Sequence, residues 1–172
     1  MKQLPLALTL ALLAVLAGCG GLPTDTPETT PTPAENETVE VRMTGNSSAT
    51  YVVAASLVAD PDSAATVTYA NGTNRTVSVS EDGAVTLGPE SGATDVEPRE
   101  ETVSGVYFEG SPKFTVTAND VPATRNLVYS VRRKGEDRLA SWGLIRCDGH
   151  VSDLSLVANE SGLTDVGFAC EP

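Results

Sequence analysis

Alternation of apolar and polar residues is the feature that most constrains what this chain folds into. Val39, Val41 and Met43 are separated by Glu40 and Arg42. A period of two places one side of a strand against a core and the other side in water. The same alternation returns at residues 77–79, 114–116, 127–131, 154–156 and 166–168. The pattern predicts an all-β fold.

Turn-forming residues fall between these runs. Asn71-Gly72 predicts a two-residue hairpin because both residue types tolerate positive φ. Glu81-Asp82-Gly83 and Lys134-Gly135-Glu136-Asp137 predict further reversals. Reversals at this spacing are typical of a sandwich, so we predict a single β-sandwich over residues 38–172, immunoglobulin-like or fibronectin-like.

Two features leave the topology of that sandwich open. Trp142 precedes both Cys147 and Cys170, whereas true immunoglobulin domains have the order Cys, Trp, Cys. Tyr51 to Ala59 is a continuous apolar run that fits either a buried strand or a short helix.

The first 18 residues have the character of a secretory signal. Lys2 is followed by an apolar stretch over residues 4–17, which is shorter than the ~20 residues that a transmembrane helix needs. Small residues end the stretch, as at a signal cleavage site. An ordinary signal peptide with a cysteine after it by chance is the alternative.

Leu16-Ala17-Gly18-Cys19 resembles the lipobox of prokaryotic lipoproteins. The resemblance implies cleavage before Cys19 and a lipid on its thiol. Two or more acyl chains hold a protein stably at a bilayer. We therefore expect a membrane-anchored protein on the extracytoplasmic face.

Residues 19–37 form a Thr/Pro-rich linker after the lipid site. Four prolines alternate with threonines between residues 23 and 33, and almost nothing there is apolar. Such a segment cannot bury enough surface to offset its ordering entropy. We expect a semi-extended stalk between the membrane and the domain.

The composition is strongly acidic. The chain has 23 acidic and 11 basic residues, with a formal net charge of −12. This charge argues against a nucleic-acid partner, because phosphate binding needs clustered cations. Acid-rich, Lys-poor composition together with the lipobox and stalk resembles the exported lipoproteins of salt-loving archaea, which implies a halophilic protein and no particular activity.

Cys147 and Cys170 remain as an even pair once Cys19 is lipidated. In an exported chain such a pair predicts a disulfide. The rival reading is a metal site built from Cys147, Asp148, His150 and Cys170. Oxidation would consume both sulfurs, so we expect no metal there.

Motifs for catalysis and cofactors are weak. His150 is the only histidine, which argues against a two-histidine copper site. No Gly-x-Ser-x-Gly or Ser-x-x-Lys occurs, and a triad of His150 with Asp148 or Asp153 lacks an identifiable serine. Calcium at Asp60-Pro61-Asp62-Ser63 or Glu81-Asp82-Gly83 stays open, without an EF-hand motif. We expect no catalytic residue and no cofactor.

Two sets of surface residues are candidate sites. One is a basic hairpin tip that fits an anionic partner, an envelope glycan or the membrane surface, with a solvated charged tip as the alternative. Its residues are Arg132, Arg133, Lys134 and Arg138. The other is a set of Asn-x-Ser/Thr glycosylation sequons. They begin at Asn36, Asn46, Asn71, Asn74 and Asn159.

These features predict a cell-surface lipoprotein with a non-catalytic binding or envelope-structural domain. An extracytoplasmic enzyme or solute-binding component, with a site formed only in three dimensions, is the alternative. A polar pocket beside His150 or an acidic pair would favour that alternative.

Overall fold

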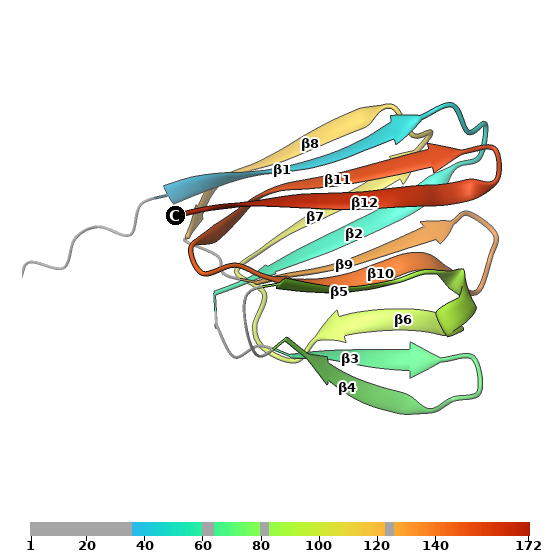
Figure 1. The fold of residues 1–172 in the computed structure, drawn as a ribbon, viewed down its shortest axis with the longest axis horizontal. Coiled ribbons are helices and arrows are strands. Elements are labelled where there is room, and N and C mark those ends of the chain that lie inside the picture. Colours follow the sequence, from blue (N-terminus) through green and yellow to red (C-terminus); the bar gives the residue numbers. More distant parts are fainter. Residues whose placement is uncertain (1–35, 60–63, 80–82, 123–125) are drawn as a thin grey trace, which may run out of the picture. The chain divides into compact units, whose positions relative to one another are not determined.

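The computed structural model describes residues 36–59, 64–79, 83–122 and 126–172, which form twelve β-strands and one short 3-10 turn (Figure 1). All of them lie in one compact unit. The predicted all-β sandwich is therefore confirmed, whereas an immunoglobulin-like or fibronectin-like topology stays a prediction. β1 begins at Asn36, two residues before the predicted start of the domain.

Sheet A has four strands in the order β12-β11-β1-β8. Its central pair, β1 and β11, is parallel, and its two outer pairs are antiparallel. The strands are β1 (Asn36–Gly45), β8 (Phe114–Pro122), β11 (His150–Asn159) and β12 (Gly162–Glu171).

Sheet B has five antiparallel strands in the order β5-β10-β9-β2-β7. They are β2 (Tyr51–Val58), β5 (Gly83–Leu87), β7 (Ser104–Gly110), β9 (Asn126–Arg133) and β10 (Leu139–Arg146). The ambiguous run from Tyr51 is thus a strand. It pairs with a neighbour on each side, and its alternate residues Tyr51, Val53, Ala55 and Leu57 are buried in the main core.

Sheet C has three antiparallel strands in the order β4-β3-β6. They are β3 (Ala64–Tyr69), β4 (Asn74–Ser78) and β6 (Ala93–Pro98), and the 3-10 turn η1 (Pro89–Ser91) precedes β6. The sequence did not predict this third sheet.

The main core lies between sheets A and B. Alternate residues of their strands meet there, with exposed fractions close to zero, as the period of two predicts. The core includes Val39, Val41 and Met43 of β1, Val53 and Leu57 of β2, Tyr129 and Val131 of β9, and Leu154 and Leu156 of β11. In the other alternating runs of sheet A, Phe114, Val116 and Val166 are partly buried against this core, and Phe168 of β12 is 41% exposed.

A second core lies between sheet C and the opposite face of sheet B. Trp142 is fully buried there beside Leu144, and its indole Nε1 donates to Ser91 Oγ of η1 at 3.1 Å. Val67 and Val96 of sheet C close this core. β9 and β10 are therefore buried on both faces, and sheet B is the middle layer of three (Figure 1).

The β3–β4 hairpin differs from the predicted two-residue turn. Tyr69 N–H donates to Thr73 O at 2.9 Å, and Gly72 N–H donates to Tyr69 O at 2.8 Å. The loop therefore has three residues, and only its last, Gly72, takes positive φ (80°). This is the turn with a glycine bulge that commonly closes three-residue hairpins. The reversal at Lys134-Gly135-Glu136-Asp137 is confirmed between β9 and β10.

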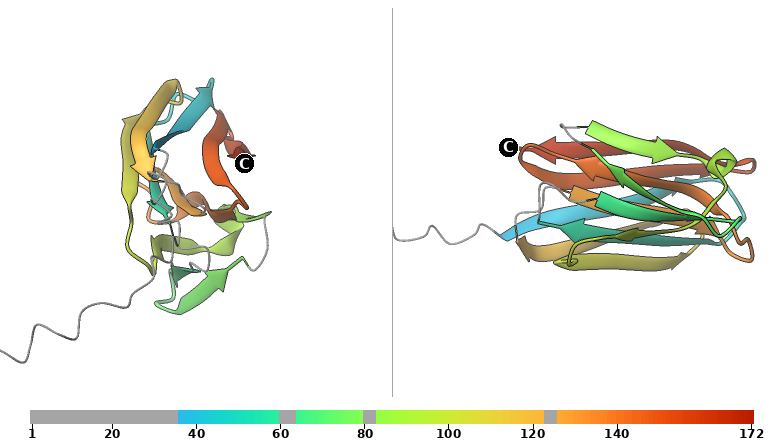
Figure 2. Two further views of the ribbon diagram at one scale, coloured as in Figure 1. Left: turned by 90° about the vertical axis from the view of Figure 1, so that its left-hand side faces the viewer. Right: turned by 90° about the horizontal axis from the view of Figure 1, so that it is seen from below.

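The two ends of the domain differ. β1 is parallel to β11, and the start of β11 pairs with the end of β12, so the first strand and the C-terminus lie at one end, here the proximal end. The connections after β1, β3, β5, β7, β9 and β11 lie at the opposite, distal end (Figure 1, and Figure 2, right). Chain entry is thus separated from these six connections by the length of the strands.

A disulfide joins Cys147 and Cys170, with their Cα atoms 5.7 Å apart. Cys147 follows β10 in sheet B, whereas Cys170 lies in β12 of sheet A. The bond therefore links the two sheets of the main core near the proximal end.

Removing this link with Cys147→Ala/Cys170→Ala is expected to lower the free energy of unfolding by about 3.5 kcal/mol. The two cysteines are 23 residues apart in the sequence, and without the disulfide the unfolded chain regains the conformational entropy that closing this loop removes. Urea unfolding of the oxidised wild type and the double variant measures the difference. The reduced wild type is the control and should approach the variant. A difference below about 1 kcal/mol would contradict the structural role.

Candidate functional site

A polar groove lies on the outer face of sheet A at the proximal end, with a volume of about 920 Å³. Three strands supply its walls: β1, β11 and β12. Its polar residues are Glu37, Glu40, Arg42, His150, Ser152, Asp153 and Glu171. Neither composition nor alternation singled out this set, apart from His150 and Asp153.

A β-bulge in β11 turns Asp153 toward the groove. Val151 pairs with Cys170 and Asp153 pairs with Ala169, so Ser152 is an extra residue on the bulged strand. Val151 and Leu154 are both fully buried. In an unbroken alternation Asp153, not Leu154, would share the inward face with Val151. The extra residue therefore keeps leucine in the core and carboxylate outside.

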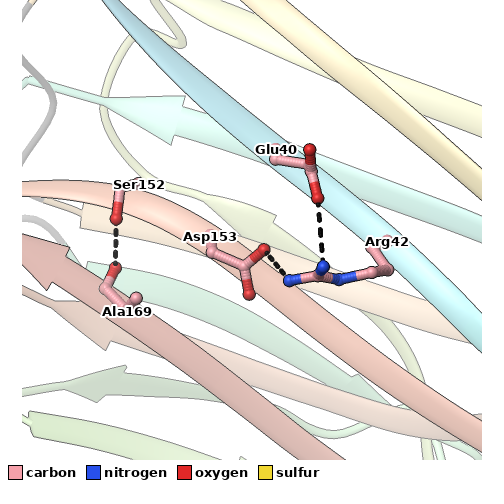
Figure 3. Close-up of polar contacts among 5 residues, drawn as sticks. All are labelled: Glu40, Arg42, Ser152, Asp153 and Ala169. Atoms are coloured by element: carbon pink, nitrogen blue, oxygen red, sulfur yellow. Dashed lines mark hydrogen bonds and ion pairs between the residues drawn. The ribbon is translucent and has the colours of Figure 1, made fainter.

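Arg42 bridges two carboxylates across the parallel strands (Figure 3). Its Nη2 donates to Asp153 Oδ2 at 2.7 Å, and its Nη1 lies 3.4 Å from Glu40 Oε1. The register places Glu40 beside Asp153, which brings all three side chains together. The Arg42 side chain is 44% exposed, so solvent screens these contacts.

His150 also lies between two carboxylates, but in a more enclosed place. Its Nδ1 is 3.2 Å from Glu37 Oε1, and its Nε2 is 3.6 Å from Glu171 Oε2. The side chains of His150 and Glu37 are only 14% and 15% exposed. Glu37 Oε2 is buried and has no hydrogen-bond partner among the described residues.

The charges of the groove indicate which ligands suit it. Four carboxylates, from Glu37, Glu40, Asp153 and Glu171, face Arg42 and His150. An excess of acceptors favours a solute with amine, amide or hydroxyl donors. Within the described parts of the chain no group of three or more His, Cys, Asp or Glu side chains is arranged to hold a metal ion.

The partners of His150 do not form a catalytic triad. Its two ring nitrogens approach Glu37 and Glu171, and neither Asp148 nor Asp153 is an ion-pair partner. Among the contacts of the described residues, no serine hydroxyl bonds to the imidazole. The sulfurs of Cys147 and Cys170 are bonded to each other, so the rival metal set of Cys147, Asp148, His150 and Cys170 is not assembled.

The four residues of the predicted basic patch do not share one environment, and three of them contact different parts of the domain. Arg132 reaches into the domain and donates to Thr94 O of β6, which joins sheet B to sheet C. Lys134 pairs with Glu109 of β7, and Glu109 raises the pKa of the lysine by accepting its hydrogen bond. Arg133 lies 3.7 Å from Glu136. Arg138 is exposed and makes no ion pair with the described residues. Together these contacts weaken the case for an anion-binding patch.

Four sequons lie at or next to the distal connections. Asn46, Asn71 and Asn74 are exposed, and Asn159 is partly exposed at the β11–β12 turn. Asn36 begins β1 at the proximal end. The backbone N–H of Asn46 donates to Ala158 O at 3.2 Å, which brings two of these sequons close together.

The predicted lipid site at Cys19, the signal and most of the linker lie outside the described residues, as do Asp60-Pro61-Asp62-Ser63 and residues 81–82. Within the part of the chain that is described, no helix has the length and apolar character needed to cross a membrane.

Comparisons with known proteins leave the family of this chain open: no family model matches it, and no curated protein matches it.

Arg42 and His150 give a matched test, because each lies within 4 Å of two carboxylates. His150→Gln is expected to lower the free energy of unfolding by about 1–3 kcal/mol, since it leaves the largely buried Glu37 carboxylate without its partner. Arg42→Gln should cost less than about 1 kcal/mol, because its contacts are exposed. Urea unfolding measures both; equal costs would contradict the difference in burial.

Proposed function

We propose that this protein is a lipid-anchored, extracytoplasmic binding protein without a catalytic role. The Leu16-Ala17-Gly18-Cys19 sequence supports an anchor at Cys19, and the Thr/Pro-rich linker supports a domain held away from the bilayer. A disulfide across the main core suits an oxidising compartment.

The observation that carries the proposal is that the two ends of the domain differ in what they present. A chain that leaves a membrane anchor enters at β1, and six connections lie at the opposite end of the strands (Figure 1). An anchored domain of this form would present the distal connections and sheet edges to other envelope components, either proteins or glycans. Loops on a rigid scaffold are the usual place for recognition.

Solute binding in the groove beside His150 is the second candidate. The specific observation in its favour is the groove itself, in which His150 lies between Glu37 and Glu171 and carboxylates supply an excess of acceptors. This role is compatible with the same anchor, and it places the ligand at the proximal end.

A thermal-shift screen separates the two candidates. The soluble fragment should begin no later than Ala34, because β1 starts at Asn36 and Glu37 contacts His150. Amines, amino acids, sugars and short peptides are tested in high salt. A ligand at one hundred times its Kd adds about 2.7 kcal/mol. Stabilisation that His150→Gln abolishes would favour the groove, whereas stabilisation unaffected by it would favour another surface.

The anchor is tested by Cys19→Ser in the full chain. The variant is expected to move from the membrane fraction to the soluble fraction, because serine has no thiol to carry the lipid and the anchor is lost. Fractionation after a high-salt wash, followed by detergent extraction, measures the change. Thr26→Ser in the linker is the control and should stay in the membrane. Retention of the Cys19→Ser variant would reject the anchor.

A further inference from the structure

The β3–β4 hairpin has a rigid tip. Its three-residue loop is closed by the two hydrogen bonds between Tyr69, Gly72 and Thr73. Ala70 N–H also donates to Gly92 O at 3.1 Å, which fixes the tip against the segment that follows η1. The tip is therefore held in one conformation at the distal end (Figure 1).

The side chain of Asn71 is oriented by the other end of its own sequon. Asn71 Oδ1 accepts hydrogen bonds from Thr73 N–H at 3.0 Å and from Thr73 Oγ1 at 2.7 Å. Two donors on one oxygen settle which atom of the amide is the oxygen. The amide nitrogen of this exposed residue consequently has no hydrogen-bond partner among the described residues.

A hollow lies directly beside this amide. It has a volume of about 390 Å³, and its lining includes Asn71 itself, the Tyr69 ring and Arg75, with Ser91 and Gly92. The Arg75 guanidinium lies over the Tyr69 ring, 5.9 Å from its centre. Guanidinium N–H groups held beside an aromatic side chain are a suitable surface for a sugar, whose hydroxyls accept hydrogen bonds.

We propose that Asn71 carries an N-linked glycan whose first sugar lies in this hollow against Tyr69 and Arg75. The reaction needs a lipid-phosphate-linked oligosaccharide as donor. The amide nitrogen bonds to the anomeric carbon of the sugar and loses a proton, the bond from that carbon to the phosphate oxygen breaks, and the lipid phosphate leaves. The proposal rests on the export that the proposed function requires.

Asn159 provides the natural comparison. Its Oδ1 likewise accepts from Ser161 N–H at 2.8 Å and from Ser161 Oγ at 2.6 Å. However, the residue two positions before it is Val157, whereas the residue two positions before Asn71 is Tyr69. A glycan on Asn159 would therefore have the same attachment geometry without an aromatic ring at that position.

Occupancy is tested on the full chain, produced in cells that glycosylate exported proteins at Asn-x-Ser/Thr. Mass spectrometry of peptides covering residues 64–79 should show an oligosaccharide on Asn71. Both Asn71→Gln and Thr73→Val should abolish it. An anchored chain with Asn71 unmodified overturns this proposal and leaves the proposed function intact, whereas a chain retained unprocessed inside the cell overturns both.

The place of the first sugar is tested by thermal unfolding. The effect of glycosylation is the Tm of protein made in glycosylating cells minus the Tm of the same protein made in cells without the transferase. This difference should be about 3 °C larger for the wild type than for Asn71→Gln, which lacks the Thr73 hydrogen bonds in both preparations. In a Tyr69→Leu background Asn71→Gln should change this difference by less than about 1 °C. Asn159→Gln is the matched control: it loses the Ser161 hydrogen bonds in both preparations, and the difference in Tm between them should equal that of the wild type.

Tyr69 packs against the second core, so a variant that spares that core is also needed. Arg75→Ala removes the guanidinium over the Tyr69 ring at an exposed position, and it should reduce the effect of the glycan on Tm by about half. A glycan effect that both Tyr69→Leu and Arg75→Ala leave unchanged overturns the docking of the sugar in the hollow.

Discussion

The structure depends on the burial of sheet B from both sides. Tyr129 and Val131 of β9 pack toward sheet A, whereas Val128 and the β10 residues Trp142 and Leu144 pack toward sheet C. Each fully buried side chain of this size contributes about 1.5–3 kcal/mol relative to exposure, so losing either cover would expose a large apolar surface. Sheets A and C therefore pack on opposite faces of sheet B, and each buries one of its two apolar faces.

This arrangement also explains the division of the polar residues. Arg132 extends its guanidinium to Thr94 O of sheet C, and Trp142 donates its indole N–H to Ser91. Both side chains satisfy polar atoms at the second interface, where bare backbone and indole groups would otherwise be costly. Arg132 consequently belongs to the fold more than to a binding surface.

The sequence predicted some of these features because they are local. The strand at Val39–Met43, the reversal at Lys134–Asp137 and the pairing of the last two cysteines follow from period, turn chemistry and an even cysteine count. The loop at Asn71-Gly72 was located correctly and its length was wrong. The dipeptide suits positive φ at two positions, but the Asn71 side chain bonds to Thr73 and only Gly72 takes the left-handed conformation.

The sequence by itself determined that the chain is all-β, where most strands lie and which face of each is apolar, because alternation acts within a strand. Only the tertiary structure decided that a third sheet covers β9 and β10, that an extra residue at Ser152 turns Asp153 outward, and that Glu37, His150 and Glu171 meet. These outcomes depend on which distant strands become neighbours. A pattern with period two is the same for every choice of neighbour, so it fixes the faces and leaves the partners to long-range packing.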